Sequence, residues 1–173
     1  MIIIPDKFVF LATPRTASRA VAEALLRKYP NAVTEYPRHH HDPPPDNNEL
    51  PCYAVIRNPF DQIMSWHSHI NDPAKTRPEN RQSLLDFAKT YENVMFFPKY
   101  NKYRLNIHAE VADKLIPYTS TLDKVAAFFE LDDLERVGHK RTYTPTDKEE
   151  RDLWRLIDKE FRADRDLWIN RFE

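Results

Sequence analysis

Three short apolar runs along the chain predict buried strands. They cover residues 7–13 (KFVFLAT), 52–56 (CYAVI) and 114–118 (KLIPY), and residues 32–35 form a fourth, shorter candidate. Runs of this length that are rich in β-branched and aromatic residues are typical of strands buried on both faces of a parallel sheet. The pattern therefore indicates a mostly parallel central sheet.

Amphipathic segments fill the intervals between these runs and predict helices. Apolar positions recur at helical spacing in residues 18–29, and further helices are predicted over residues 58–70, 81–91 and 120–129. Thr146 followed three residues later by Glu149 is a capping box that opens a final helix, with Leu153, Ile157 and Phe161 on one face. Strands that alternate with helices predict a three-layer α/β/α fold in a single domain, residues 1–173.

Composition narrows the function classes. The chain has 26 Lys and Arg residues against 27 Asp and Glu residues, a net charge of −1, which argues against a nucleic-acid or membrane-surface partner. Cys52 is the single cysteine, which excludes an internal disulfide. The N-terminus has no signal-peptide pattern, and no apolar stretch approaches the roughly 20 residues that span a bilayer. We expect a cytoplasmic protein.

Glycine is almost absent. Gly138 is the only glycine in 173 residues. This excludes a G-x-G-x-x-G dinucleotide fingerprint and a Walker loop ending in G-K-S/T. Any loop that binds phosphate in this protein must therefore do so without glycine.

The loop between the first predicted strand and its helix has the chemistry of an anion site. It reads T-P-R-T-A-S-R over residues 13–19. A helix N-terminus offers open backbone N–H groups, Thr16 and Ser18 add hydroxyls, Arg15 and Arg19 add cations, and the small Ala17 lets a ligand approach. The alternative is an ordinary helix start with two solvated arginines.

A second loop follows the strand over residues 52–56. Arg57 ends that strand, and Ser65 lies eight residues later on the next helix, on a face that can look back at the strand end. A guanidinium and a hydroxyl so placed could hold one phosphate. The alternative is a structural ion pair between Arg57 and Asp61. If the two strands are neighbours, both loops face one crevice at the carboxyl edge of the sheet.

These two motifs resemble those of sulfotransferases that use 3′-phosphoadenosine 5′-phosphosulfate (PAPS). P-R-T-A-S-R is similar to the family's 5′-phosphosulfate loop, and R-N-P-F-D-Q-I-M-S over residues 57–65 is similar to its 3′-phosphate motif, R-[ND]-P-x-D-x-x-x-S. Weaker likeness extends to residues 118–131 and to the tail from His139 to Phe172. The resemblance implies a P-loop-NTPase-like sulfotransferase fold and an enzyme of the carbohydrate sulfotransferase type.

The resemblance also implies roles for individual residues. Arg15 would contact the sulfonate and the bridging oxygen, as a catalytic and co-substrate-binding residue. The remaining PAPS-binding residues would be Thr16, Ala17, Ser18 and Arg19 at the 5′-phosphate, Arg57 and Ser65 at the 3′-phosphate, and Lys140 and Arg141 in a loop over the nucleotide. No metal is expected. Arg19 departs from the family, which usually has Ser or Thr at that position, and the chain is short for the family.

Sulfonyl transfer also needs a base that removes the acceptor's proton. Arginine does not deprotonate, whereas histidine titrates near neutrality. The resemblance places a Glu or His near the end of the short second strand, where the candidates are His40 and His41, then Glu35, then His39. A solvated polar loop is the alternative for this segment.

Three functions follow from these residues. The first is transfer of a sulfonate from PAPS to a hydroxyl of a sugar or small molecule, with release of adenosine 3′,5′-bisphosphate (PAP). The second is a catalytically degraded module of the same fold that binds a nucleotide or polyanion, suggested by Arg19 and the small size. The third, a glycine-free phosphotransferase, is disfavoured because no Lys follows the loop in Walker register.

Overall fold

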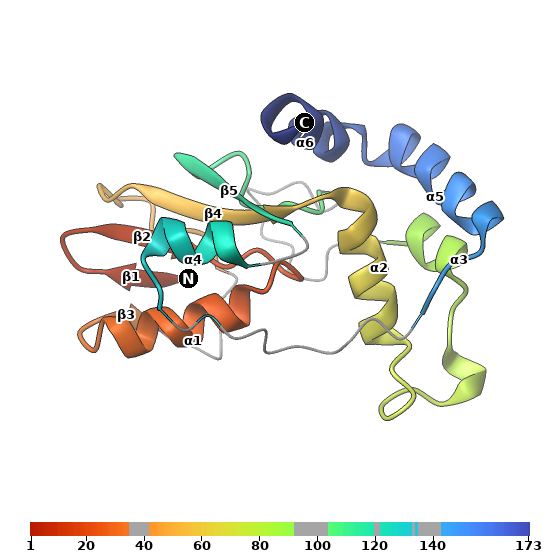
Figure 1. The fold of residues 1–173 in the computed structure, drawn as a ribbon, viewed down its shortest axis with the longest axis horizontal. Coiled ribbons are helices and arrows are strands. Elements are labelled where there is room, and N and C mark those ends of the chain that lie inside the picture. The colour runs from red at the N-terminus through yellow and green to blue at the C-terminus, as the bar shows by residue number, and fades with distance from the viewer. Residues whose placement is uncertain (35–41, 92–103, 120–121, 133, 135–142) are drawn as a thin grey trace. The chain divides into compact units, whose positions relative to one another are not determined.

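The computed structural model describes residues 1–34, 42–91, 104–119, 122–132, 134 and 143–173 (Figure 1). The elements follow in the order β1 (Ile2–Ile4), β2 (Phe8–Leu11), α1 (Ser18–Lys28), β3 (Val33–Thr34), β4 (Cys52–Arg57), α2 (Pro59–Ile70), η1 (Pro78–Asn80), α3 (Leu84–Lys89), β5 (Lys114–Tyr118), α4 (Asp123–Phe129), α5 (Asp147–Glu160) and α6 (Arg162–Phe172). This mixture of strands and helices confirms the α/β class.

The chain divides into two compact units, which are described separately. Unit 1 takes its described residues from Met1–Arg57 and Asn106–Gly138. Unit 2 takes its described residues from Asn58–Val94, Lys102–Leu105 and His139–Glu173. A single domain over the whole chain stays a prediction.

Unit 1 is built on a five-stranded sheet in the order β3-β1-β2-β4-β5. β2, β4 and β5 pair in parallel, and β1 is antiparallel to both β2 and β3. Four strands therefore run in one direction and β1 runs in the other, which confirms a mostly parallel sheet. The pairing of β2 with β4 confirms that these two strands are neighbours.

The two faces of this sheet have different coverings. Alternate strand residues point to opposite faces, so Ile2, Phe10, Val55 and Ile116 pack with α1 and α4 in one core, whereas Val9, Leu11 and Ala54 lie on the other. The second face packs against non-helical residues, among them Leu50, Val111 and Ala112. The described helices of unit 1 therefore cover one face, and the third layer of the α/β/α arrangement stays a prediction.

In the part of unit 2 that the structure describes, the regular elements are all helical. Buried side chains from α2, α3 and α5 share one core, including Ile63, Met64, Leu84, Leu153 and Ile157. Because α3 begins only at Leu84, with the Ser83 hydroxyl accepting from the N–H of Asp86 at 3.2 Å, it is shorter than predicted. None of the described helices is long and apolar enough to cross a bilayer.

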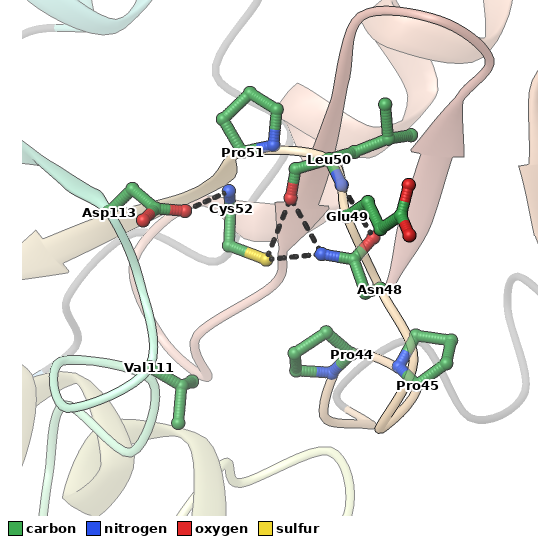
Figure 2. Close-up of a pocket in the computed structure, with 9 residues that line it drawn as sticks. All are labelled: Pro44, Pro45, Asn48, Glu49, Leu50, Pro51, Cys52, Val111 and Asp113. Carbon is green, nitrogen blue, oxygen red and sulfur yellow. Dashed lines mark hydrogen bonds between the residues drawn. The ribbon is translucent and has the colours of Figure 1, made fainter.

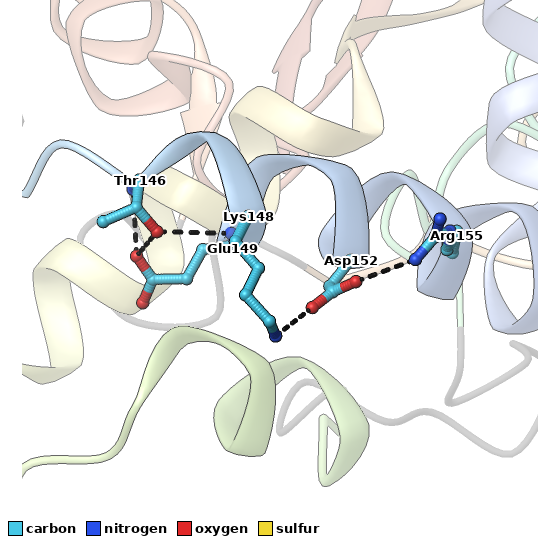
Figure 3. Close-up of polar contacts among 5 residues, drawn as sticks. All are labelled: Thr146, Lys148, Glu149, Asp152 and Arg155. Carbon is cyan, nitrogen blue, oxygen red and sulfur yellow. Dashed lines mark hydrogen bonds and ion pairs between the residues drawn. The ribbon is translucent and has the colours of Figure 1, made fainter.

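The capping box that begins the last predicted helix is confirmed (Figure 3). The Thr146 hydroxyl accepts from the N–H of Glu149 at 3.3 Å, and the Glu149 carboxylate accepts from the N–H of Thr146 at 2.9 Å. Exposed ion pairs join Asp152 to Lys148 at 2.7 Å and to Arg155 at 3.1 Å, and exposed pairs of this kind contribute little stability. The predicted single helix is two helices, α5 and α6, which meet at the buried Phe161.

Candidate functional site

The loop that joins β2 to α1 has an unusual backbone for a segment without glycine. Arg15 has φ 63° and Ala17 has φ 59°, both in the left-handed region, whereas Thr16 between them does not have a positive φ. Alternation of this kind turns successive N–H groups toward one side and makes a concavity that suits an anion. The buried Thr16 hydroxyl donates to the carbonyl of Thr13 at 2.7 Å and holds the loop in this form.

The start of α1 complements this loop. Ala17 is the N-cap, no side chain caps the helix, and its first turn contains no acidic residue. The N–H groups of a first helical turn have no acceptor within the helix and carry a partial positive charge. Ser18, the first residue of α1, is buried beside them. The predicted hydroxyl and backbone donors therefore lie on one short segment.

Arg57 brings the second predicted loop against the first. It is the last residue of β4, and its Nη1 atom donates to the carbonyl oxygen of Arg15 at 3.3 Å. Burial lowers the pKa of Arg15, and the neighbouring positive charge of Arg57 lowers that pKa further. Two guanidinium groups are thus held close enough to repel each other, and an anion near both would offset that repulsion.

Two residues that the sequence did not identify hold Arg57. The side chain of Asn106 exchanges two hydrogen bonds with the main chain of Arg57. The guanidinium of Arg57 lies over the ring of Tyr118, with its central carbon 4.8 Å from the ring centroid. Tyr118 ends β5, so the three parallel strands β2, β4 and β5 bring their carboxyl ends to this point. We call Thr13–Ser18, Arg57, Asn106 and Tyr118 the Arg15–Arg57 site.

Thr13 adds a buried hydroxyl to the Arg15–Arg57 site. Thr13 is fully buried, and its Oγ1 atom has no hydrogen-bond partner among the described residues. A buried hydroxyl without a partner costs about 1–3 kcal/mol, so native structures seldom keep one without a reason. A phosphate oxygen bound within reach of Oγ1 would accept a hydrogen bond from this hydroxyl.

Arg19 differs from the other predicted cations. Its side chain is 70% exposed, and its Nε atom donates to the Glu23 carboxylate at 2.9 Å, one helical turn along α1. The Arg19 guanidinium is therefore engaged on the outer side of the helix. The part of Arg19 that lies at the predicted anion site is its backbone, in the first turn of α1.

The remaining predicted residues lie elsewhere. Ser65 is half-buried in α2, and its predicted pairing with Arg57 would join the two units, so it stays a prediction. The base candidates and the second basic loop lie outside the described residues: Glu35, His39, His40 and His41, together with Lys140 and Arg141.

A pocket of about 450 Å³ opens at the opposite end of β4 (Figure 2). Cys52 lies in it, with its Sγ atom 3.3 Å from the Asn48 amide nitrogen, and its N–H donates to Asp113 at 2.6 Å. Burial raises the pKa of Cys52, and the charge of Asp113 raises it further. Both effects disfavour the thiolate, which is the nucleophilic form of a cysteine.

The chemistry of the Arg15–Arg57 site depends on cations and hydrogen-bond donors. Across the described ranges, no group of three or more His, Cys, Asp or Glu side chains is placed to hold a metal ion. Comparison of the chain with family models, curated proteins and solved structures finds no match. The candidate anion site therefore rests on its own residues, which lie at the carboxyl edge of the parallel strands β2, β4 and β5.

Proposed function

We propose that this protein is a sulfotransferase that moves a sulfonate from PAPS to a hydroxyl of a sugar or small molecule and releases PAP. The observation that carries the proposal is the hydrogen bond from Arg57 to the carbonyl of Arg15. Two motifs 42 residues apart, each suited to one end of a bisphosphorylated adenylate, are held side by side by that bond.

The Arg15–Arg57 site fits such a ligand through its donors. Arg15 and the start of α1 would hold the 5′-phosphosulfate, and Arg57 would hold the 3′-phosphate, with Ser65 as a second ligand. Hydrogen bonds between charged groups are stronger than neutral ones, at about 1.5–3 kcal/mol each. The buried Thr13 hydroxyl supplies one more donor to the same loop.

In the proposed reaction the acceptor oxygen forms a bond to sulfur while the bond between sulfur and the phosphate oxygen breaks. The acceptor's proton passes to a base, for which His40 and His41 are the first candidates, followed by Glu35 and His39. Negative charge builds up on the leaving phosphate, where the Arg15 guanidinium would stabilise it. Positioning and electrostatics supply most of the catalysis in this scheme.

The test is a calorimetric titration with PAP and, separately, with Mg-ATP. We expect PAP to bind and Arg57→Ala to weaken its binding about 10- to 100-fold, the loss of one charge-assisted contact. Arg27→Ala, which removes an exposed arginine from the last turn of α1, is the matched control and should bind PAP as the wild type does. Unchanged PAP binding by Arg57→Ala would overturn the proposal, and a preference for Mg-ATP would favour a phosphotransferase.

A degraded binding module is the second candidate, and the Arg19–Glu23 ion pair favours it. The family usually has a hydroxyl ligand at that position, whereas here the side chain is directed to Glu23. Transfer of labelled sulfonate from PAPS to a panel of glycans and phenols separates the two, because a binding module retains PAP without turnover. Activity that survives joint replacement of Glu35 and His39 to His41 would show that the base is another residue.

A further inference from the structure

Asn106 holds the main chain of Arg57 on both sides of its Cα atom. Its Oδ1 atom accepts from the N–H of Arg57 at 3.1 Å, and its Nδ2 atom donates to the Arg57 carbonyl at 3.2 Å. The side chain is 1% exposed, so water does not compete for these bonds. One amide thus fixes both peptide groups that flank Arg57.

The position of Arg57 in the sheet explains why such a contact is needed. β2 pairs with β4 from Cys52 to Ala54, whereas Arg57 lies three residues further along and pairs only with Tyr118 of β5. Beyond the end of β2, no strand among the described residues pairs with β4 on that side. Backbone N–H and C=O groups that are buried need a partner, and Asn106 supplies it.

Two neutral groups contact the guanidinium end of Arg57. Its Nη1 atom donates to the Arg15 carbonyl, and the face of Tyr118 lies 4.8 Å from its central carbon. A carbonyl oxygen and an aromatic face both attract a cation without removing its charge. With its backbone fixed by Asn106, the side chain is ordered before a ligand arrives, which lowers the entropy lost on binding.

We propose that Asn106 is a positioning residue that orders Arg57 and thereby sets the preference of the Arg15–Arg57 site for a 3′-phosphorylated adenylate over the 5′-monophosphate. This inference rests on the proposed function. Asn106 acts through Arg57, because its hydrogen bonds to the Arg57 main chain lie at the opposite end of that residue from the guanidinium.

The first test needs no ligand. The Tyr118 ring should shift the NMR signals of the Arg57 side chain upfield, and Tyr118→Leu gives their position without the ring. In Asn106→Ala and Asn106→Leu we expect the Arg57 signals to move toward the Tyr118→Leu position. Signals that stay at the wild-type position in whichever variant folds would overturn the positioning role.

The second test measures affinity for PAP and for adenosine 5′-monophosphate. We expect Asn106→Ala to weaken PAP binding about tenfold, with less than about a twofold effect on the monophosphate. In an Arg57→Ala background the same substitution should add no further loss. Equal weakening of both nucleotides, or an additive loss in the double variant, would overturn the selectivity role and leave Asn106 with only a general effect on the fold.

The two tests separate the inference from the proposed function. If the wild-type protein does not bind PAP, the proposed function fails, and with it the selectivity role. The NMR result still decides whether Asn106 orders Arg57. If PAP binds and the NMR signals do not move, the proposed function stands and the inference fails.

Discussion

His67 makes the stability of unit 2 depend on pH. It lies in α2 and is 4% exposed, and its Nε2 atom is 2.9 Å from the carbonyl oxygen of Gln82. A carbonyl oxygen only accepts, so Nε2 carries the proton. The ring packs edge-on against Tyr143 at 4.9 Å between centroids, and its Nδ1 atom has no hydrogen-bond partner within the described part of the chain. A second proton, on Nδ1, would therefore have no acceptor among those residues.

Burial lowers the pKa of His67 below its ordinary 6.5, against smaller opposing effects of the Gln82 carbonyl and the Glu149 carboxylate. The unfolded chain takes up this proton near pH 6.5, and the folded chain takes it up only at lower pH. The stabilising effect is therefore complete above pH 6.5 and is lost as the pH falls toward the folded pKa. The free energy of unfolding falls by up to about 1.4 kcal/mol per pH unit in this window.

The titration of Glu149 falls at lower pH than the expected loss of stability from His67. Hydrogen bonds from Tyr143 and Thr146 lower the pKa of Glu149 below its ordinary 4.5. Its contribution is therefore present above the unfolded value and is lost only as the pH falls below it. The difference in unfolding free energy between the wild type and His67→Leu, measured between pH 7.5 and 5, therefore reports on His67.

The assay is urea unfolding followed by tryptophan fluorescence. All three tryptophans, Trp66, Trp154 and Trp168, lie in unit 2, so the signal reports on that unit. We expect the advantage of the wild type over His67→Leu to shrink between pH 6.5 and 5.5, by up to about 1 kcal/mol. Tyr143→Phe, which keeps the ring, should retain the wild-type pH dependence over this range. Parallel curves for wild type and His67→Leu would refute the argument.

Three further substitutions test other parts of the structure. Thr13→Val should raise the free energy of unfolding by about 1 kcal/mol, because it removes a buried hydroxyl without a partner, and should weaken PAP binding about fivefold. Calorimetry on the variant checks both, and unchanged PAP affinity would exclude Thr13 from the ligand's contacts. Ala17→Gly should raise the melting temperature, because a left-handed conformation costs an alanine about 1–2 kcal/mol and costs a glycine little. A melting temperature below that of the wild type would contradict the φ of 59° at Ala17. Thr146→Ala should cost unit 2 about 1 kcal/mol through loss of its helix cap, with urea unfolding as the measurement and Lys148→Ala as an exposed control.

Much of the sheet could be predicted because its strands are apolar on both faces. β2, β4 and β5 stand out as short apolar runs, and β5 has the predicted bounds. β1 was missed because Ile2–Ile4 has only three residues and no alternation. Its hairpin to β2 turns through Asp6, which has φ 60°, where glycine or asparagine would have signalled a turn.

The site was predictable where its residues lie at the ends of strands that the sequence pattern identified. Arg15 and Arg57 follow strands that the pattern identified, and parallel neighbours must end at one edge. Asn106 lies 49 residues from Arg57 in a segment without periodicity, so no local signal marks it. The Arg19–Glu23 pair could have been found, since an acid four residues after a base shares a helix face with it.

Arg57 also supports the backbone of the glycine-free loop between β2 and α1. Arg15 and Ala17 hold left-handed conformations that each cost about 1–2 kcal/mol, and such conformations persist only where the surroundings fix them. Two contacts that help to fix them are the Thr16 hydroxyl bond to Thr13 and the Arg57 bond to the Arg15 carbonyl. Arg57→Ala therefore removes a support of the loop as well as a charge. Arg57→Lys separates the two tasks, because it keeps a cation and loses the planar fork that bonds the carbonyl and lies over Tyr118. If the fork supports the loop, the lysine variant should bind PAP nearly as poorly as the alanine variant. If charge alone matters, it should restore most of the affinity.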